Sequence, residues 1–132
     1  MPDYLTTAPI SKTIKWVSYV ASALPVILLI FSAAGKFFQP EGMEVNIKSL
    51  GWEMSQMFSL GILEIACVVI YLIPRTAVLG AILLTAYLGG ATATHVRVGD
   101  SVLIPVLAGG FIWLGLFLRD PRISALIPLR RS

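Results

Sequence analysis

The sequence predicts an all-α fold: an integral membrane, antiparallel four-helix bundle. The first observation is composition, since 57% of the 132 residues are hydrophobic and only 13% are charged. Soluble domains contain about 25% charged residues. The second is a mean hydropathy of +0.86. The third is pattern, because four long apolar stretches are separated by short segments that hold most of the charges. The length suits a single transmembrane domain with no second domain.

Each stretch is long enough to cross a bilayer, for which an α-helix needs about 20 apolar residues. Trp16 and Phe37 lie near the two ends of the first stretch, where aromatic anchors are expected. Pro74 ends the second stretch, because the residue before a proline rarely adopts the helical conformation. We expect an outer loop at 39–53, part of it a short surface helix, and a cytoplasmic tail at 119–132. The expected spans are residues 16–37, 54–73, 76–96 and 101–118.

The basic residues predict the orientation of the spans. Four spans place both termini on one side of the membrane, and the side richer in Lys and Arg is the cytoplasm. We therefore expect both termini in the cytoplasm, in a bacterial-type cytoplasmic membrane. The net charge of +3 does not indicate nucleic acid, because the basic residues flank apolar stretches. Seven of them belong to the side of the termini: Lys12, Lys15, Arg75, Arg119, Arg122, Arg130 and Arg131.

Several classes of site are excluded by counting. The single cysteine, Cys67, cannot form an internal disulfide or a cysteine-based metal cluster. The single histidine, His95, cannot form a bis-histidine haem site within one chain. The sequence has no phosphate loop, nucleophile elbow or metal-binding motif. We expect no metal and no intrinsic cofactor.

Glu64 is the first candidate for chemistry. Ten uncharged residues precede it in the second span and ten follow it before Arg75. A carboxylate at mid-membrane costs roughly 2.5–3.5 kcal/mol on insertion scales, and such residues are functional by default. Counting from the turn at Pro74 places Thr85 and Tyr87 near its depth. Glu64 would serve as a ligand contact or proton relay, or alternatively as a structural acid bonded to Tyr87 or Ser32.

Lys36, His95 and Arg97 mark the outer boundary of the first and third spans. Singly, each is an interfacial side chain; together they predict a cationic rim, in which His95 could accept a proton. By residue count His95 lies roughly 13 Å further out than Glu64, so we expect the rim to stand above Glu64 without touching it. A cavity between the two levels could hold a polar head group with an apolar tail, as in a quinone, lipid or sterol.

The third span also carries small residues at every fourth position, a spacing that favours close packing of membrane helices. One row is Ala81, Thr85, Gly89 and Ala93, and a second is Ala86, Gly90 and Thr94.

Four short segments resemble the core pattern of the DoxX-like family. They are residues 32–36 (SAAGK), 61–64 (GILE), 73–77 (IPRTA) and 90–100 (GATATHVRVGD). The resemblance covers about residues 32–105 and implies a four-span membrane protein whose polar positions are Lys36, Glu64, His95 and Arg97. The family takes its name from a membrane subunit of a thiosulfate:quinone oxidoreductase. Related proteins associate with oxidoreductases and thiol-stress systems, and distant relatives assist receptor assembly.

The main functional hypothesis is a small subunit or accessory of a membrane redox system. Glu64 and His95 would handle protons as catalytic residues, while Lys36, Arg97 and Tyr87 would bind a quinone-like or other amphipathic ligand in an outward-facing cavity. The sequence leaves open whether the protein is an enzyme. The alternatives are a non-enzymatic structural or assembly partner of other membrane proteins and, less favoured, a small transporter. Expected partners are the lipid bilayer, other membrane or redox proteins, and a second copy of the chain.

Overall fold

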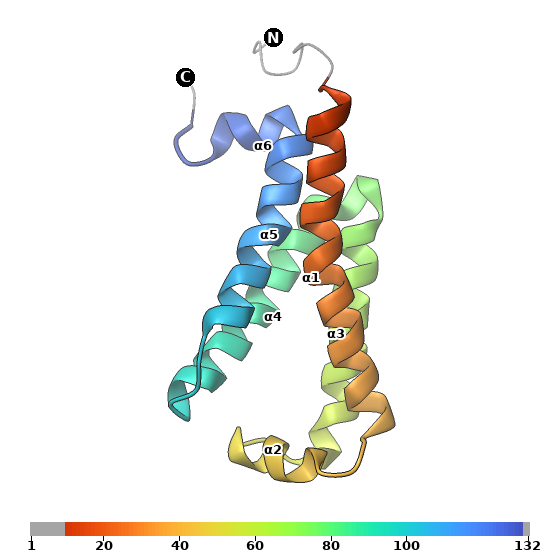
Figure 1. The fold of residues 1–132 in the computed structure, drawn as a ribbon, viewed down its shortest axis with the longest axis vertical. Helices are drawn as coiled ribbons and strands as arrows, with labels where there is room; N and C mark the ends of the chain where they lie inside the picture. The colour runs from red at the N-terminus through yellow and green to blue at the C-terminus, as the bar shows by residue number, and fades with distance from the viewer. Residues whose placement is uncertain (1–9, 131–132) are drawn as a thin grey trace.

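The computed structural model describes residues 10–130, and within that range every regular element is helical. The predicted all-α membrane bundle is confirmed (Figure 1). The helices are α1 (Lys12–Phe38), α2 (Met43–Ser49), α3 (Met54–Leu72), the short 3-10 helix η2 (Pro74–Thr76), α4 (Ala77–Arg97), α5 (Leu103–Arg119) and α6 (Pro121–Leu126).

The helix ends follow from local chemistry. Ser11 caps α1 by accepting a hydrogen bond from the Ile14 amide at 3.2 Å. The helix stops where Gln39 takes a left-handed conformation, with φ 48°. Glu53 and Gln56 form a capping box at the start of α3. Asp120 caps α6 through the Arg122 amide, so α5 and α6 are separated by a sharp turn.

The four long helices form a closed ring. α1 packs against α3 and α5, and α4 packs against the same two helices from the other side. Leu29, Val68, Leu84 and Ile112, one from each long helix, lie in the common core. Large apolar side chains also point outward, with Ile27 64% exposed. Such an outer surface suits contact with lipid tails rather than water.

The helices meet the length and composition required to cross a membrane. α1, α3 and the stretch Pro74–Arg97 are each long and apolar enough to span it, and α5 is a shorter apolar helix of 17 residues. Together with the outward apolar surface, this identifies an integral membrane protein.

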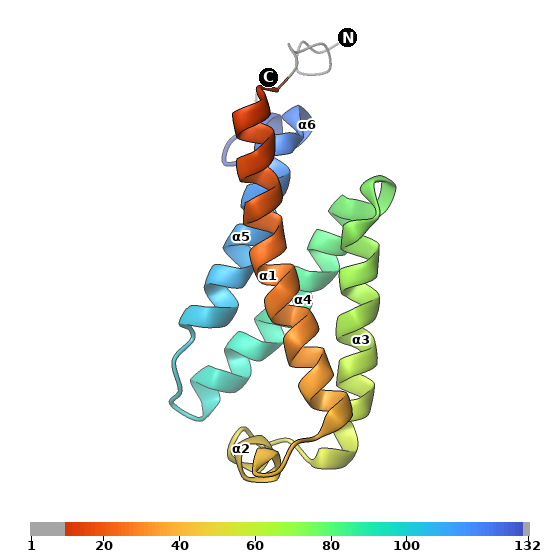
Figure 2. The same cartoon turned by 45° about the vertical axis from the view of Figure 1, so that its right-hand side comes forward.

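The two ends of the bundle carry different elements. The start of α1 and the whole of α6 lie at one end, and α2 lies at the opposite end (Figures 1 and 2). Toward α2, the pair α1–α3 diverges from the pair α4–α5, and both views show α2 lying across the opening.

The closest helix contacts are not those predicted from the rows of small residues. Ala81 is fully buried, but Gly89 and Gly90 are exposed, and an added Cβ at either would meet nothing within 4 Å. The close approaches involve Gly80, which lies against the backbone of Tyr71, and Gly115, which lies against Ser22. The three members of the second row, Ala86, Gly90 and Thr94, line a cavity.

Candidate functional site

A cavity of about 840 Å³ lies in the open half of the bundle. Its walls come from α1, α3, α4, the start of α5 and the segment that includes α2. Most of the wall is apolar, including Leu29, Phe31, Met57, Leu60, Leu88 and Ile104. Four of the five predicted site residues also line it: Lys36, Glu64, Tyr87 and His95.

Glu64 lies at the centre of the polar part and is 1% exposed. Its Oε2 accepts a hydrogen bond from Lys36 Nζ at 2.8 Å and another from the Tyr87 hydroxyl at 3.2 Å. Lys36 Nζ also donates to Ser32 Oγ at 2.6 Å. Within the described residues, Oε1 of Glu64 accepts no hydrogen bond. The site therefore has one saturated carboxylate oxygen and one that lacks a partner.

The direct Lys36–Glu64 ion pair overturns the prediction that the cationic rim stands clear of Glu64. The residue count compared Cα levels, whereas helical side chains lean toward the N-terminus of their own helix. α1 and α3 run in opposite directions, so Lys36 leans back into the bundle while Glu64 leans outward. The two side chains therefore meet although their Cα atoms lie at different depths in the membrane.

Unused donors and acceptors remain around the ion pair. An ammonium group has three N–H donors, of which Glu64 and Ser32 take two. The Lys36 ammonium also lies 6.0 Å from the centre of the Tyr87 ring, at the limit of a cation–π contact. The site can thus donate to a ligand carbonyl through Lys36, whose side chain is 15% exposed, whereas Glu64 Oε1 is buried.

His95 and Arg97 occupy different environments from that pair. His95 lines the cavity, and its Nδ1 lies 3.4 Å from Asp100 Oδ2. Arg97 is not part of the lining. Its Nη2 donates to the Leu50 carbonyl at 2.8 Å, which connects the end of α4 to the segment after α2. The three residues of the predicted rim therefore do different things. Lys36 pairs with Glu64, His95 lines the cavity, and Arg97 holds the segment after α2.

Thr85, expected near Glu64, instead takes part in a separate contact. Its Oγ1 accepts a hydrogen bond from Trp113 Nε1 at 2.7 Å and donates to the Ala81 carbonyl. This contact links α4 to α5 and leaves Tyr87 as the α4 partner of Glu64.

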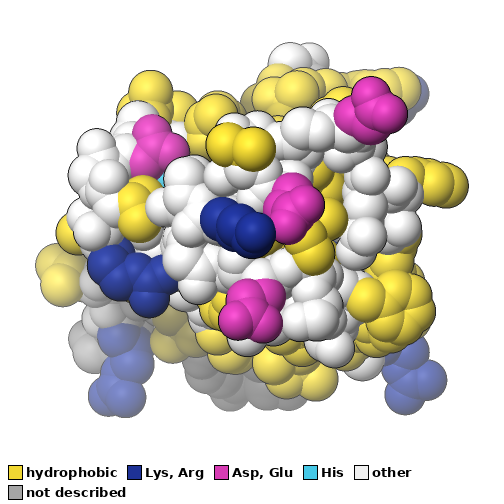
Figure 3. Space-filling view, turned by 90° about the horizontal axis from the view of Figure 1, so that it is seen from below, with side chains coloured by type: hydrophobic (Ala, Val, Ile, Leu, Met, Phe, Trp, Pro, Cys, Tyr) yellow, Lys and Arg dark blue, Asp and Glu magenta, His cyan; other side chains and the backbone are white. Residues whose placement is uncertain are grey.

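α2 covers the cavity, a role that the sequence reasoning missed. The cavity is lined on this side by Met43, Ile47 and Leu50. Their spacing of four and three residues is typical of the apolar face of a helix. The outer face bears interspersed acidic and basic side chains (Figure 3). On α2, the hydrogen bond from Lys48 to Glu44, at 2.9 Å, raises the pKa of Lys48.

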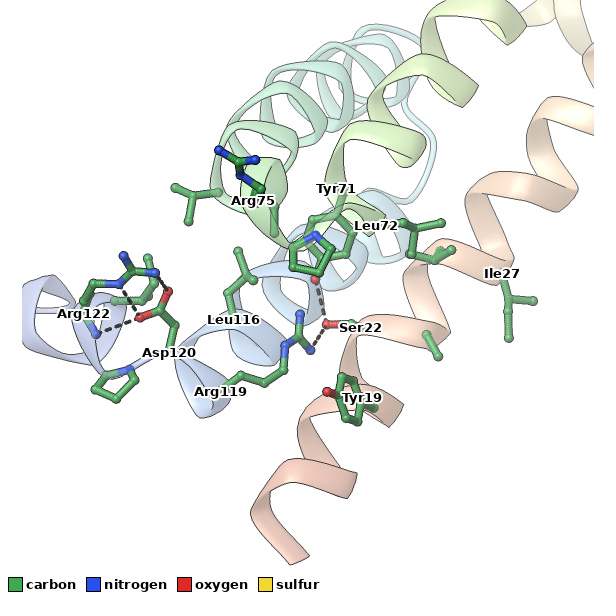
Figure 4. A pocket seen from close by; sticks show the side chains of 17 residues that line it. Tyr19, Ser22, Ile27, Tyr71, Leu72, Arg75, Leu116, Arg119, Asp120 and Arg122 are labelled. Carbon is green, nitrogen blue, oxygen red and sulfur yellow. Dashed lines mark hydrogen bonds and ion pairs between the residues drawn. The ribbon is translucent and has the colours of Figure 1, made fainter. Parts of the chain in front are cut away.

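A second cavity, of about 1000 Å³, lies at the opposite end of the bundle and was also missed (Figure 4). Arg119 Nη1 donates there to Ser22 Oγ at 2.8 Å and to the Ser18 carbonyl at 3.1 Å. Tyr71 hydrogen-bonds to Ser22 Oγ at 2.7 Å and donates to the Ile112 carbonyl. Two buried serines one turn apart in an apolar helix could have signalled this polar cluster.

A comparison with protein-family models gives a match over most of the bundle. The model of the DoxX-like family matches residues 20–116, which include α3 and α4 in full and most of α1 and α5. The comparison with curated proteins gave no match, and neither did the comparison with solved structures. The matched range contains Lys36, Glu64, Tyr87, His95 and Arg97. The chain therefore belongs to the DoxX-like family.

Proposed function

We propose that this protein binds a quinone-like amphipathic molecule in the cavity beneath α2, as a small subunit or accessory of a membrane redox system. The observation that carries the proposal is Glu64 Oε1, which is buried and accepts no hydrogen bond within the described residues. Buried polar atoms are almost always hydrogen-bonded, so an exception calls for a missing partner. The cavity that Glu64 lines offers room for that partner.

A purely structural ion pair would have a different environment. Burying two charges is favourable only when their remaining lone pairs and protons are also satisfied. Here Glu64 and Lys36 both line a cavity of about 840 Å³, and Oε1 accepts no hydrogen bond within residues 10–130. That arrangement suits a ligand with oxygen atoms at its head, while the apolar walls suit a tail.

The polar residues have separate roles in this proposal. Lys36 donates to a carbonyl oxygen of the head group, and Glu64 accepts a hydrogen bond from its hydroxyl form. Tyr87 orients the Glu64 carboxylate through its own hydrogen bond. His95, in the cavity wall next to Asp100, exchanges protons with the outside. Electrons would come from a partner oxidoreductase, because the proposal assigns the chain only binding and proton transfer.

The test uses the purified protein and a short-chain quinone as the probe. Trp52 lines the cavity, so quenching of its fluorescence reports binding. We expect Lys36→Met to weaken binding about tenfold or more, because a hydrogen bond from a charged donor contributes about 1.5–3 kcal/mol. Lys48→Met is the matched control, since it removes the same charge from an exposed position on α2.

Two results would oppose the proposal. Equal binding by both lysine variants and the unchanged protein would show that the probe does not reach the ion pair. Absence of measurable binding, together with no quinone in solvent extracts of the purified protein, would favour a structural or assembly role.

A further inference from the structure

We infer that the cavity at the end of the bundle opposite Glu64 is a binding site for an anionic phospholipid. It lies between α1, α5, α6 and the turn that joins α3 to α4. Arg75, Arg119 and Arg122 surround the same opening and come from three different elements (Figure 4). Among residues 10–130, the single carboxylate in its lining is Asp120. Positive charge is therefore in excess.

Two of the three arginines have no counter-ion within residues 10–130. Arg122 binds Asp120 through two hydrogen bonds of 3.0 Å, so these two charges form a pair. Arg119 donates to neutral oxygens and lies 5.3 Å from the centre of the Tyr19 ring. The exposed Arg75 side chain forms no ion pair in that range. Guanidinium groups match phosphate oxygens in geometry and charge.

Arg119 is held in position before any ligand arrives. Ser22, which accepts its hydrogen bond, is buried and is itself bonded to the buried Tyr71 hydroxyl. Tyr71 donates in turn to the Ile112 carbonyl at 2.9 Å. Gly115 allows this approach of α5 to α1, because a Cβ there would overlap Ser22 Oγ. A preorganised donor loses little entropy on binding a ligand.

The remaining wall suits an acyl chain. Ala23, Val26 and Ile27 of α1 and Leu72 of α3 line the cavity beside the arginines. Ile27 is 64% and Leu72 56% exposed, so this wall continues onto the lipid-facing surface. A soluble anion would leave that apolar wall unused, whereas a phospholipid uses both parts. Basic pockets between membrane helices commonly bind anionic head groups in this way.

The test compares lipids retained by the full-length protein. The protein is equilibrated in mixed micelles containing equal amounts of phosphatidylglycerol and phosphatidylcholine with identical acyl chains, and bound lipid is counted by native mass spectrometry. We expect preferential retention of phosphatidylglycerol. Arg75→Gln, a change at an exposed side chain, should reduce it about fivefold. Lys15→Gln removes a charge at the same end but outside the cavity and should change it by less than about twofold.

A second variant tests the tail. Ala23→Phe places a ring in the apolar wall and should lower retention of both lipids, while circular dichroism verifies that each variant remains folded. Equal losses in the Arg75 and Lys15 variants would overturn the inference, because they would indicate general surface attraction. Displacement of the lipid by millimolar inorganic phosphate, or full retention in Ala23→Phe, would also overturn it and indicate a soluble anion instead.

Discussion

The Glu64 carboxylate is buried within the bundle, and the Lys36 ammonium compensates its charge. The two groups are 1% and 15% exposed and lie 2.8 Å apart. A buried ion pair contributes little net stability, because desolvation offsets the attraction, but removing one partner leaves a charge without compensation. At the scale of single residues, the pair therefore adds little stability, but neither residue can be replaced alone without a cost.

The pair predicts a strongly non-additive set of variants. We expect Lys36→Met to lower the free energy of unfolding by about 3–5 kcal/mol. Glu64→Leu should cost less, because the partly exposed ammonium keeps Ser32 as an acceptor. The double variant should recover most of the loss. Unfolding in detergent, followed by tryptophan fluorescence, measures all three, and losses that simply add would contradict this account.

Asp120 predicts a decline in stability on the acid side. Its hydrogen bonds to Arg122 lower its pKa below the ordinary value of 3.8. A lowered pKa in the folded state adds stability that is fully present above the unfolded value and is lost as pH falls through the folded value. The melting temperature should therefore fall as the pH drops below 3.8. Asp120→Asn should reduce that fall, whereas Asp100→Asn, at the opposite end, should leave it unchanged.

At the scale of elements, α4 changes character along its length. Near η2 it lies directly against α3, with Gly80 over the Tyr71 backbone. Further along it diverges, and Gly90 and Ala91 become part of the cavity wall. One helix therefore provides both the close contact with α3 and one side of the site.

Two glycine substitutions distinguish these halves. Gly80→Ala should destabilise the protein by about 3 kcal/mol, because the new methyl group overlaps backbone atoms that cannot move aside. Gly89→Ala meets open space and should be neutral or stabilise by up to about 1 kcal/mol through helix propensity. Thermal unfolding compares the two, and similar effects would show that the α3–α4 contact is not close.

α2 depends on a tether at the end of α4. The Arg97 guanidinium binds the Leu50 carbonyl, and Gly51 next to it has φ +85° and no room for a Cβ. We expect Arg97→Gln to increase amide hydrogen exchange in residues 43–51 severalfold and to leave α3 unaffected. Lys12→Gln, at the other end of the chain, serves as the control. Unchanged exchange in α2 would show that apolar contacts alone hold it over the cavity.

At the scale of the whole molecule, three arginines gather at the end of the bundle opposite α2 (Figure 1). The start of α1, η2 and α6 lie at one end, together with Arg75, Arg119 and Arg122, while α2 covers the other end (Figures 1 and 2). By the positive-inside rule, the arginine-rich end would face the cytoplasm. The quinone-type site would then open outward, and the phospholipid site would meet the cytoplasmic leaflet.

Reporter fusions in a bacterial host test this orientation. A green fluorescent protein fused after Ser132 should fluoresce, because it folds in the cytoplasm, and alkaline phosphatase at the same position should be inactive. The same phosphatase inserted after Gly42, before α2, should be active. The opposite pattern of activity would reverse the orientation of both cavities.

Much of this architecture could be predicted from composition and order. Four uncharged stretches and the prolines between them indicated the helices, since burying backbone groups in lipid leaves few other solutions. Four of the five residues predicted for the site line one cavity, and Glu64 could be singled out because an ionisable group within an apolar span is conspicuous. The Lys36–Glu64 contact was not, because a residue count contains no side-chain direction. The arginine cavity was missed because Arg119 was interpreted only as a marker of topology.

The sequence by itself determined that the chain is an all-α membrane protein with a carboxylate inside its second span, because hydropathy and charge act locally along the chain. Only the tertiary structure decided which charge meets Glu64 and that one oxygen of Glu64 has no hydrogen-bond partner within residues 10–130. It also decided that two cavities, with different chemistry, occupy opposite ends of the bundle. These features depend on the angles at which the helices diverge and on side chains leaning toward one another across antiparallel neighbours, and both arise only when the helices pack together.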